Sequence, residues 1–484
     1  MQAIGRYGGI RISRHAAALG CGVLLAASIL TQTAMASTAG AVRAVNPGQP
    51  PAKTLVVDDD GKEGNQCGKA RFTSIQAAVN TARAGDVVRV CPGVYTEFVQ
   101  INKPLTLLGQ VGAVASANCF DTSTSQPGDL DPTRYAILNR PAGKQGNLLS
   151  VAARGATVAG LVLQEATTVV LQTPNIEDAA VHLTSDSAGT RVHHNLIRLN
   201  SLGIDLGGDG SATTRVDHNC LRDNAFAMAS QRQDLVSGMV DNNETFRTEV
   251  AAYEIGWTFA STRNSKFAAN VSRGDGFTTR PGFTGQVFFV RNSSNITIED
   301  NDIEPVAFGI RSVSDNTDLT ITGNRIVNGS QIGIFFAPSA APTQKAWVAG
   351  NTITDFGPSA LGYGIGIASS STNLASVSDA TIEDNVLRGN VRGMSVNPNS
   401  TDVVVRANVA TGNQTGIFAL AGPNAASTYG YRFEQNTLLG NTLVDARDDS
   451  ALGSGGEPRH TWVGNVCNVD IPQGKICQPP PATP

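Results

Sequence analysis

The sequence predicts an all-β fold, a single-stranded right-handed parallel β-helix, from three observations. Only 16% of the 484 residues are charged and 6% are aromatic, whereas 51 are glycine. This composition favours short strands and turns over long helices. An asparagine also recurs at nearly regular intervals, and residues of alternating apolar and polar character surround it. Together these features are typical of a solenoid built from repeated short strands.

The repeated unit is an apolar residue, two residues of any kind and an asparagine. Successive matches are separated by 24, 24, 27, 31, 23, 27, 34, 23, 28 and 29 residues. The shortest interval sets the length of one structural turn, and loops absorb the excess in the others. The asparagines are Asn195, Asn219, Asn243, Asn270, Asn301, Asn324, Asn351, Asn385, Asn408, Asn436 and Asn465.

Each repeat contains three short strands and three bends. In TRVHHNLIRLNSLGIDL, apolar residues alternate with polar ones, and asparagine and glycine mark the bends. Such a unit describes one turn of a parallel β-helix, in which each strand pairs with its equivalent about 4.8 Å away. The asparagines would then stack as a hydrogen-bonded ladder, so we expect them to be structural.

The first 36 residues predict a secretory signal. Arg6, Arg11 and Arg14 precede an apolar run over residues 16–30, and Ala34-Met35-Ala36 is a typical cleavage sequence. Because the run is short for a membrane span, we expect cleavage and a secreted or periplasmic protein. Residues 37–53 are expected to be a linker.

Signal cleavage would also change the charge. It removes three arginines and no acidic residue, which shifts the formal net charge from −4 to −7. An acidic surface argues against nucleic-acid binding, and no later segment is apolar enough for a membrane span. We expect a monomer with no membrane association after cleavage.

The β-helix is expected over residues 54–470, with an N-terminal module and cap over 54–110. One amphipathic helix is predicted over 74–83, because its apolar residues recur with helical spacing. These residues are Ile75, Ala78, Val79 and Ala82. A solenoid exposes strand edges at its ends, so we interpret this helix as a cap. The proline-rich tail, 471–484, cannot continue a sheet.

Six cysteines follow the signal, and an even number predicts disulfides in an exported chain. We expect Cys67 to pair with Cys91 and Cys467 with Cys477, because each pair closes a short loop at one end of the molecule. The pairing of the remaining two cysteines stays open. The sequence contains no C-x-x-C pair, so a structural zinc site has little support.

The stretch FTSIQAAVNTARAGDVVRVCPGVYTEFVQINKPLTLLG resembles the N-terminal module of secreted pectin-lyase-like right-handed β-helix proteins. The shared patterns are S-I-Q-A-A-V, G-D, P-G-x-Y-x-E and K-P-L-T-L-x-G. With the repeats, the resemblance covers residues 54–470. It implies membership of the parallel β-helix repeat, carbohydrate-binding and sugar-hydrolase group. The implied chemistries are polysaccharide β-elimination, often with calcium, glycoside hydrolysis, uronate epimerisation, or binding alone.

One column of polar residues is a candidate metal site. His193, Asp217 and Asp241 each lie two residues before a repeated asparagine, so they should be one turn apart. Adjacent carboxylates can bind calcium, which makes Asp217 and Asp241 the candidate ligands and Ca²⁺ the candidate cofactor. The alternative is a solvated strand edge without a ligand.

Candidate substrate-binding residues lie near the same bends. Histidine can contact a sugar or transfer a proton, arginine can bind a uronate carboxylate, and tryptophan can stack on a sugar. Alternatively, the arginines pair with local acids and the tryptophan packs under a loop. The residues are His193, His194, Arg198, His218, Arg222 and Trp257.

Two sets of residues are candidates for catalysis. A lyase needs a base and a group that stabilises the enolate, and Lys266 with Arg247 or Arg273 could supply them. A hydrolase needs two carboxylates, and Asp205 and Glu254 occupy equivalent places two turns apart, or about 9.6 Å from the strand spacing. That separation permits an inverting reaction. However, the paired Asp-Asp, Gly-His-Gly and Arg-Ile-Lys signatures of polygalacturonase-type hydrolases are absent.

We therefore expect the protein to recognise, and to cleave, an extracellular polysaccharide along the central turns, between Glu177 and Arg311. A uronate-containing polymer is the favoured substrate and lyase-type elimination the favoured reaction. The alternatives are a non-catalytic carbohydrate-binding or surface protein and a glycoside hydrolase that uses Asp205 and Glu254.

Overall fold

The computed structural model describes residues 51–60, 67, 69–109, 119–120, 128–164, 178–256, 260–275, 285–305, 307–357, 361–367, 374–422, 427–450 and 456–481. The chain divides into Met1–Pro51 and Ala52–Pro484, and all the described strands lie in the second unit. The predicted signal, most of the predicted linker and Trp257 lie outside the described residues. Within those residues, no helix has the length and apolar character needed to cross a membrane.

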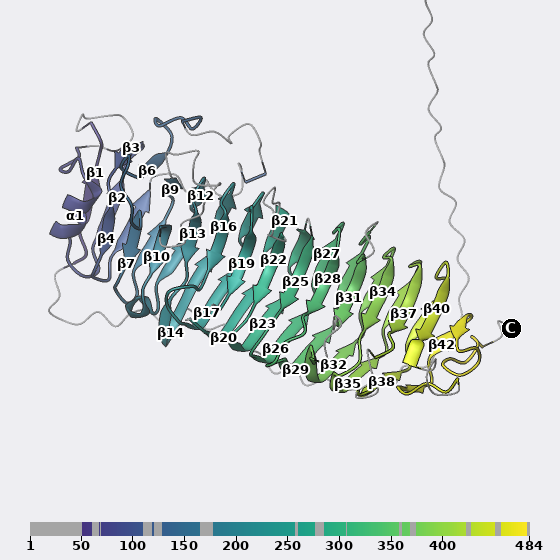
Figure 1. The fold of residues 1–484 in the computed structure, drawn as a ribbon. Coiled ribbons are helices and arrows are strands. Elements are labelled where there is room, and N and C mark those ends of the chain that lie inside the picture. The colour runs from purple at the N-terminus through teal and green to yellow at the C-terminus, as the bar shows by residue number, and fades with distance from the viewer. Residues whose placement is uncertain are drawn as a thin grey trace, which may run out of the picture. The chain divides into compact units, whose positions relative to one another are not determined.

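The second unit forms a solenoid of three parallel sheets, here called sheets A, B and C (Figure 1). Each turn of the chain contributes a strand to sheet A, then B, then C, so every strand pairs with its equivalent in the next turn. The all-β prediction is thus confirmed.

Sheet A has 15 strands: β1 (Thr54–Val57), β2 (Val87–Val90), β5 (Thr106–Gly109), β8 (Thr157–Ala159), β11 (Arg191–His193), β14 (Gly208–Asp217), β17 (Leu235–Asp241), β20 (Thr262–Ala268), β23 (Ser293–Glu299), β26 (Asn316–Thr322), β29 (Thr343–Ala349), β32 (Val377–Glu383), β35 (Thr401–Arg406), β38 (Tyr431–Glu434) and β41 (Thr461–Val463).

Sheet B has 14 strands: β3 (Gly93–Thr96), β6 (Ala136–Asn139), β9 (Val162–Gln164), β12 (Leu196–Arg198), β15 (Cys220–Arg222), β18 (Glu244–Phe246), β21 (Val271–Asp275), β24 (Asp302–Pro305), β27 (Arg325–Val327), β30 (Thr352–Thr354), β33 (Val386–Arg388), β36 (Val409–Thr411), β39 (Thr437–Leu439) and β42 (Val466–Cys467).

Sheet C also has 14 strands: β4 (Val99–Ile101), β7 (Leu149–Val151), β10 (Ala179–Leu183), β13 (Leu202–Asp205), β16 (Phe226–Ala229), β19 (Ala251–Ile255), β22 (Gln286–Val290), β25 (Phe308–Ser312), β28 (Ile332–Phe336), β31 (Tyr363–Ile367), β34 (Arg392–Val396), β37 (Thr415–Ala419), β40 (Val444–Asp448) and β43 (Asp470–Ile471).

One continuous apolar core fills the space between the sheets. In sheet A it is built from register partners such as Val192, Val216, Val240, Phe267 and Ile298, which are all buried. Because side chains alternate between the two faces of a strand, the residues on either side of these positions point outward. Function must therefore be sought on the outer faces and at the bends.

The predicted asparagine ladder is present at the bend between sheets A and B. In each step the side-chain amide of one asparagine donates to the side-chain oxygen of the next, as between Asn195 and Asn219 at 3.0 Å. The residue before each asparagine turns the chain with a positive φ, 55° at His194 and 53° at His218. The asparagine side chains satisfy backbone groups that this tight bend leaves unpaired, so their role is structural.

Helix α1 spans Ile75–Thr81, slightly less than predicted, and packs against β1, β2 and β4. Ser74 caps it, and the Glu97 carboxylate accepts hydrogen bonds from the Ser74 hydroxyl and from the backbone of Ile75 and Gln76. A carboxylate at a helix N-terminus is stabilising, which explains why the motif P-G-x-Y-x-E accompanies S-I-Q-A-A-V. Whether the helix acts as a cap remains a prediction.

Three disulfides connect the described cysteines. The two predicted bridges, Cys67–Cys91 and Cys467–Cys477, are present. The third, Cys119–Cys220, joins the segment that follows β5 to strand β15 of sheet B. Around it, Leu130 and other apolar residues of that segment pack on the outer face of sheet B.

The C-terminal end departs slightly from the predicted boundary. Ile471 still belongs to β43, which pairs with β40, and Gln478 forms an isolated bridge with Val466. The first residues of the predicted tail therefore pack back onto the solenoid. Just before them, Trp462 stacks on Phe433 with ring centroids 4.0 Å apart and contributes to the end of the core.

Candidate functional site

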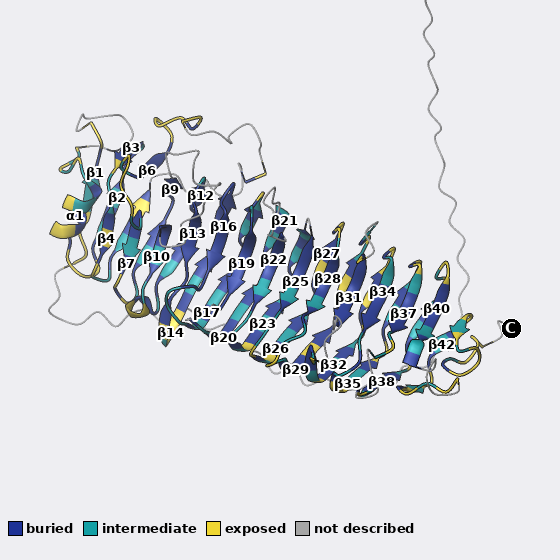
Figure 2. Cartoon of the chain, viewed as in Figure 1, coloured by how far each residue is buried: buried dark blue, intermediate teal, exposed yellow. Residues whose placement is uncertain are grey.

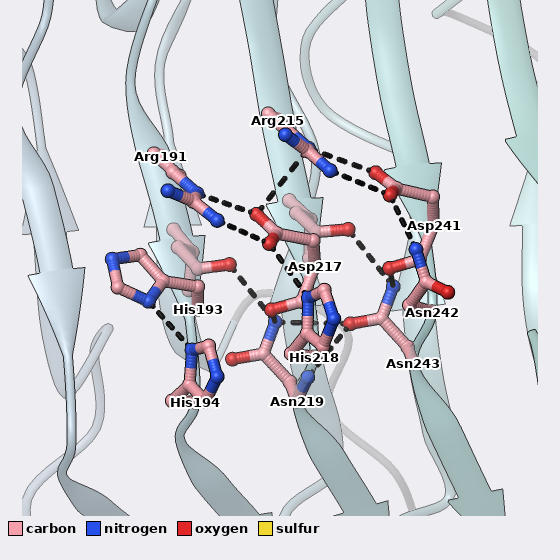
Figure 3. A network of polar contacts seen from close by, with 12 residues as sticks. Arg191, His193, His194, Arg215, Asp217, His218, Asn219, Asp241, Asn242 and Asn243 are labelled. Atoms are coloured by element: carbon pink, nitrogen blue, oxygen red, sulfur yellow. Dashed lines mark hydrogen bonds and ion pairs between the residues drawn. The ribbon is translucent and has the colours of Figure 1, made fainter. Parts of the chain in front are cut away.

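The first candidate site lies where sheet A bends toward sheet B (Figure 3). Asp217, at the end of β14, is buried, and Arg191 from the preceding turn binds both of its carboxylate oxygens, at 2.8 and 2.6 Å. His218 adds a contact from Nδ1 at 2.8 Å. Burial alone would raise the pKa of Asp217, but the hydrogen bonds from Arg191 and His218 outweigh it and lower the pKa. Both oxygens of the Asp217 carboxylate thus accept hydrogen bonds.

Asp241 repeats the arrangement one turn later. Arg215 binds its two oxygens at 3.0 and 2.8 Å, and the Asn242 amide donates to it at 2.7 Å. Bidentate arginine pairs of this kind use the oxygens that a cation would need. We therefore do not retain Asp217 and Asp241 as calcium ligands, because guanidinium groups already satisfy them.

The three histidines of this bend do lie together, as predicted. Nδ1 of His193 is 2.8 Å from Nδ1 of His194, and the His194 ring is parallel to the His218 ring, with centroids 5.1 Å apart. Burial, aided by nearby Arg191, lowers the pKa of His193 to about 4. Burial and then His218 lower the pKa of His194. Both rings are therefore neutral at pH 7.

Arg198 and Arg222 cannot contact a substrate, contrary to the sequence prediction. Both side chains are fully buried. Arg198 pairs with Asp129 at 2.6 Å, and the Arg222 guanidinium lies over the Phe246 ring. The reason is the segment tied down by Cys119–Cys220, which covers the outer face of sheet B at these turns.

Of the residues expected to serve a lyase, Arg247 and Arg273 lie on adjacent turns, where the Arg247 backbone N–H donates to the Arg273 carbonyl at 3.1 Å. Lys266 lies in β20 of sheet A and pairs with Glu299. Arg273 lies in β21 of sheet B and pairs with Asp302, and Arg247 follows β18 and pairs with Asp223. Each of the three cations thus pairs with a different acid.

The residues expected to serve a hydrolase do share a face. Asp205 lies on the outer face of sheet C, where His182 is its register partner. Oδ2 of Asp205 is 2.8 Å from His182 Nδ1 and 2.6 Å from Arg232 Nε. Arg232 also donates to Asn147, at 2.9 Å. The carboxylate is thus buried beneath groups that reach the surface.

Glu254 occupies the same column two strands later, after Ala229. Arg291 contacts its Oε1 at 2.6 Å, and the Gln231 side-chain amide donates to its Oε2 at 3.3 Å. The backbone N–H of Gln231 donates to Asp205 at 3.5 Å. Burial raises the pKa of Glu254 to about 7, against the opposing effect of Arg291. Asp205, which contacts Arg232 and His182, and Glu254 therefore differ in environment, as an acid and a base require.

Beyond Glu254 the outer face of sheet C becomes aromatic and cationic. Phe289, Arg311 and Phe335 are register partners on successive strands, and Arg311 lies 5.5 and 5.7 Å from the two ring centroids. Figure 2 colours these strands as buried or intermediate rather than exposed. We call this surface the aromatic–arginine track, and it consists of Phe289, Phe308, Arg311, Phe335, Tyr363, Arg392, Phe418 and Arg447.

Comparison with known families agrees with this architecture. Residues 240–377 match the family described as "Right handed beta helix region". With its three stacked parallel sheets, the chain is a parallel β-helix protein. A comparison of this β-helix protein with curated proteins returned no match.

Several solved structures are similar to this chain at low sequence identity. The Dettilon tailspike protein is 13% identical over 76% of this chain, with a TM-score of 0.46, and the β-helix protein spans 66% of its length. The mannuronan C-5 epimerase A-module of Azotobacter vinelandii is 14% identical over 84% of this chain and 95% of its own, with a TM-score of 0.40. A mannuronic acid specific polysaccharide family 6 lyase from human gut microbiota is 12% identical over 88% of this chain and 91% of its own, with a TM-score of 0.46. At these identities the likeness concerns the fold alone.

Sequence reasoning missed the partners that complete the surface of sheet C in this β-helix protein. His182, Arg232 and Arg291 were not singled out, nor were the rings of the track. An alignment of the repeats on the sheet C strand would have found His182 and Phe289, because they share one strand position with Asp205 and Glu254. Arg232 and Arg291 follow the ends of their strands and would not have been found in this way.

Proposed function

We propose that this protein binds an acidic polysaccharide lengthwise along the outer face of sheet C. The aromatic–arginine track carries the proposal. Phe289, Arg311 and Phe335 share one column across β22, β25 and β28, and the same column holds Gly366 and Ser395 before it reaches Phe418 and Arg447. Because this column crosses successive turns, a linear polymer could follow it.

The track combines the two groups that an acidic sugar requires. Phe289 and Phe335 are only partly buried and offer apolar ring surfaces, whereas Phe308, Tyr363 and Phe418 are buried. Arginine can supply paired donors to a carboxylate, although Arg447 already binds both oxygens of Asp449 in this way. Arg392 lies 4.2 Å from the Phe418 ring centroid, and its hydrogen bonds go to the hydroxyls of Tyr363 and Ser395. Burial lowers the pKa of Arg392 and of Arg311. An anion would therefore stabilise guanidinium groups that water solvates incompletely.

The three disulfides agree with an extracellular setting for such a ligand, because disulfides persist in oxidising compartments. The proposal requires neither calcium nor the pairs on sheet A. Adding a chelator to the binding assay tests the calcium dependence that the sequence led us to expect.

The binding test compares uronate polymers with a neutral glucan by isothermal titration. Wild-type protein should bind the acidic polymers alone, and R311Q/R392Q should weaken this affinity by about tenfold or more, as expected for lost charge-assisted hydrogen bonds. W347A is the matched control, because Trp347 is an exposed aromatic residue on sheet A. Equal affinity of R311Q/R392Q and wild type would contradict the proposal.

Hydrolysis of the bound polymer is a second candidate function, and one observation favours it. Glu254, with its pKa of about 7, and Asp205 lie in one column next to the track, and Arg291 links them to it through the Phe289 ring at 4.9 Å. Glu254 could protonate a leaving oxygen while Asp205 activates water, as in an inverting hydrolase.

The reaction is tested by incubating the protein with the bound polymer and assaying new reducing ends and ultraviolet absorbance. Hydrolysis predicts new reducing ends without new ultraviolet absorbance, and E254Q and D205N should produce no reducing ends. The hydrolysis rate should fall above a pH of about 7, because Glu254 then loses its proton. New absorbance would instead support elimination. Binding without either signal would leave a carbohydrate-binding protein.

A further inference from the structure

Arg291 lies where the aromatic–arginine track meets the buried acid Glu254. It follows strand β22, its Nη2 atom is 2.6 Å from Glu254 Oε1, and its guanidinium carbon lies 4.9 Å from the Phe289 ring centroid. We propose that Arg291 is a further binding residue for the acidic polysaccharide, and that a polymer carboxylate bound to it makes Glu254 take up a proton. The inference rests on the proposed function, because it concerns the same surface of sheet C.

Arg291 reaches solvent, whereas the carboxylate that it contacts does not. Its side chain is 22% exposed, against 4% for the side chain of Glu254. A guanidinium has several N–H donors in one plane, so it can contact two carboxylates on different edges. A polymer that lies on the Phe289 ring can therefore reach Arg291 from the solvent side while Glu254 contacts it from within.

The other groups that face Glu254 cannot replace the charge of this arginine. The Gln231 side-chain amide, which donates to Glu254 Oε2 at 3.3 Å, is neutral. Asp205 lies in the same column two strands earlier, and its carboxylate holds Arg232 at 2.6 Å and His182 at 2.8 Å. These two groups thus already serve a different acid.

Glu254 can change its protonation state near neutral pH. Burial raises its pKa to about 7, against the opposing effect of Arg291. One guanidinium compensates one negative charge, so a second carboxylate on Arg291 leaves the buried Glu254 carboxylate poorly compensated. Its pKa should then rise further, and Glu254 should take a proton from solvent. Polymer binding and protonation of Glu254 therefore favour each other.

This coupling predicts that the affinity for the polymer falls as the pH rises above about 7. Below that pH, Glu254 already carries its proton in the free protein. Above it, binding must draw a proton from solvent, so affinity decreases until the pH reaches the raised pKa of the complex. A rise of about one pKa unit on binding corresponds to a total loss of about tenfold.

The test is isothermal titration calorimetry of the intact protein with polygalacturonate and with alginate, in phosphate and in Tris buffer. Because the two buffers differ in ionisation enthalpy, the difference in observed enthalpy gives the number of protons taken up. Wild type should take up about half a proton per protein at pH 7, where free Glu254 is about half protonated. E254Q, which keeps the shape of the side chain, should bind without proton uptake.

R291Q should bind about fivefold more weakly, as expected for a lost hydrogen bond to a charged group. It should also take up no proton at pH 7, because buried Glu254 without its arginine is already protonated. R406Q is the matched control, since Arg406 pairs with Glu383 at 2.6 Å on sheet A. It should keep the affinity and the proton uptake of wild type.

Two kinds of failure can be distinguished. Binding by wild type without proton uptake, or uptake that persists in E254Q or R291Q, would overturn this inference and leave the proposed binding intact. Absence of binding to either polymer would contradict the proposed function, and this inference with it.

Discussion

At the scale of single residues, Asn324 illustrates how one side chain holds a bend. Its amide donates to the Ile298 carbonyl at 2.9 Å and to the Asn351 side chain at 2.9 Å, and its oxygen accepts from the backbone and side chain of Asn301. All these groups are buried. One asparagine side chain thus forms hydrogen bonds that connect three successive turns.

Replacing Asn324 with alanine should lower the free energy of unfolding by about 3 kcal/mol, because several buried polar groups lose their partners. Guanidinium unfolding measures the change. The matched control is N328G, since Asn328 is exposed and its φ of 64° suits glycine. A loss in N324A below about 1 kcal/mol would show that the ladder is not structural.

His460 makes stability depend on pH. It is buried, neither ring nitrogen has a hydrogen-bond partner among the described residues, and burial lowers its pKa to about 4. Its unfolded pKa is about 6.5. Between these values the unfolded chain binds a proton that the folded chain does not, so stability should fall as the pH drops from about 6.5 to 4, by about 3 kcal/mol.

The measurement is the free energy of unfolding of wild type and H460F at several pH values. Phenylalanine suits the position, because the rings of Tyr429, Tyr431 and Phe433 surround it. H460F should lose less free energy of unfolding on acidification than wild type. Part of the pH dependence should remain in the variant, because the pKa of His193 is also lowered to about 4. Identical pH dependence in the two proteins would refute this role.

At the scale of elements, the segment around Cys119 determines which face of the solenoid is closed. It covers the outer side of β12 and β15 and buries Arg198 and Arg222. The Cys119–Cys220 bridge holds it there across 101 residues. Closure of so long a loop restricts the unfolded chain more than a short loop does.

Replacing both cysteines of this bridge with alanine should therefore lower the free energy of unfolding by about 4.7 kcal/mol. C467A/C477A is the matched control, because its bridge spans 10 residues and should contribute about 2 kcal/mol less. Denaturant unfolding of both variants measures the difference. Equal losses, or a larger loss in the control, would contradict the loop-length argument.

The elements also show what the sequence could and could not predict. The spacing from Asn195 to Asn465 predicted the solenoid, the ladder and the order of strands, because that period follows from the backbone geometry of one turn. The burial of Arg198 was not predictable, since the repeat does not indicate which face a non-repeating segment covers. Nor was the pairing of Arg191 with Asp217, which joins residues on adjacent turns.

At the scale of the whole solenoid, the three outer faces differ in what they can bind. The inserted segment covers sheet B in its early turns. Central turns of sheet A present paired charges, such as Arg191 with Asp217 and Lys266 with Glu299. Sheet C presents the acid pair followed by the column of Phe289, Arg311 and Phe335. A long acidic polymer therefore finds its most complementary surface on sheet C.

Hydroxyl-radical footprinting with and without saturating acidic polysaccharide tests this claim most directly. Phe289 and Phe335 on sheet C should become protected, whereas exposed Trp347 on sheet A should react equally in both states. Protection of Trp347, or binding that leaves both phenylalanines as reactive as before, would contradict the assignment of the polysaccharide to sheet C.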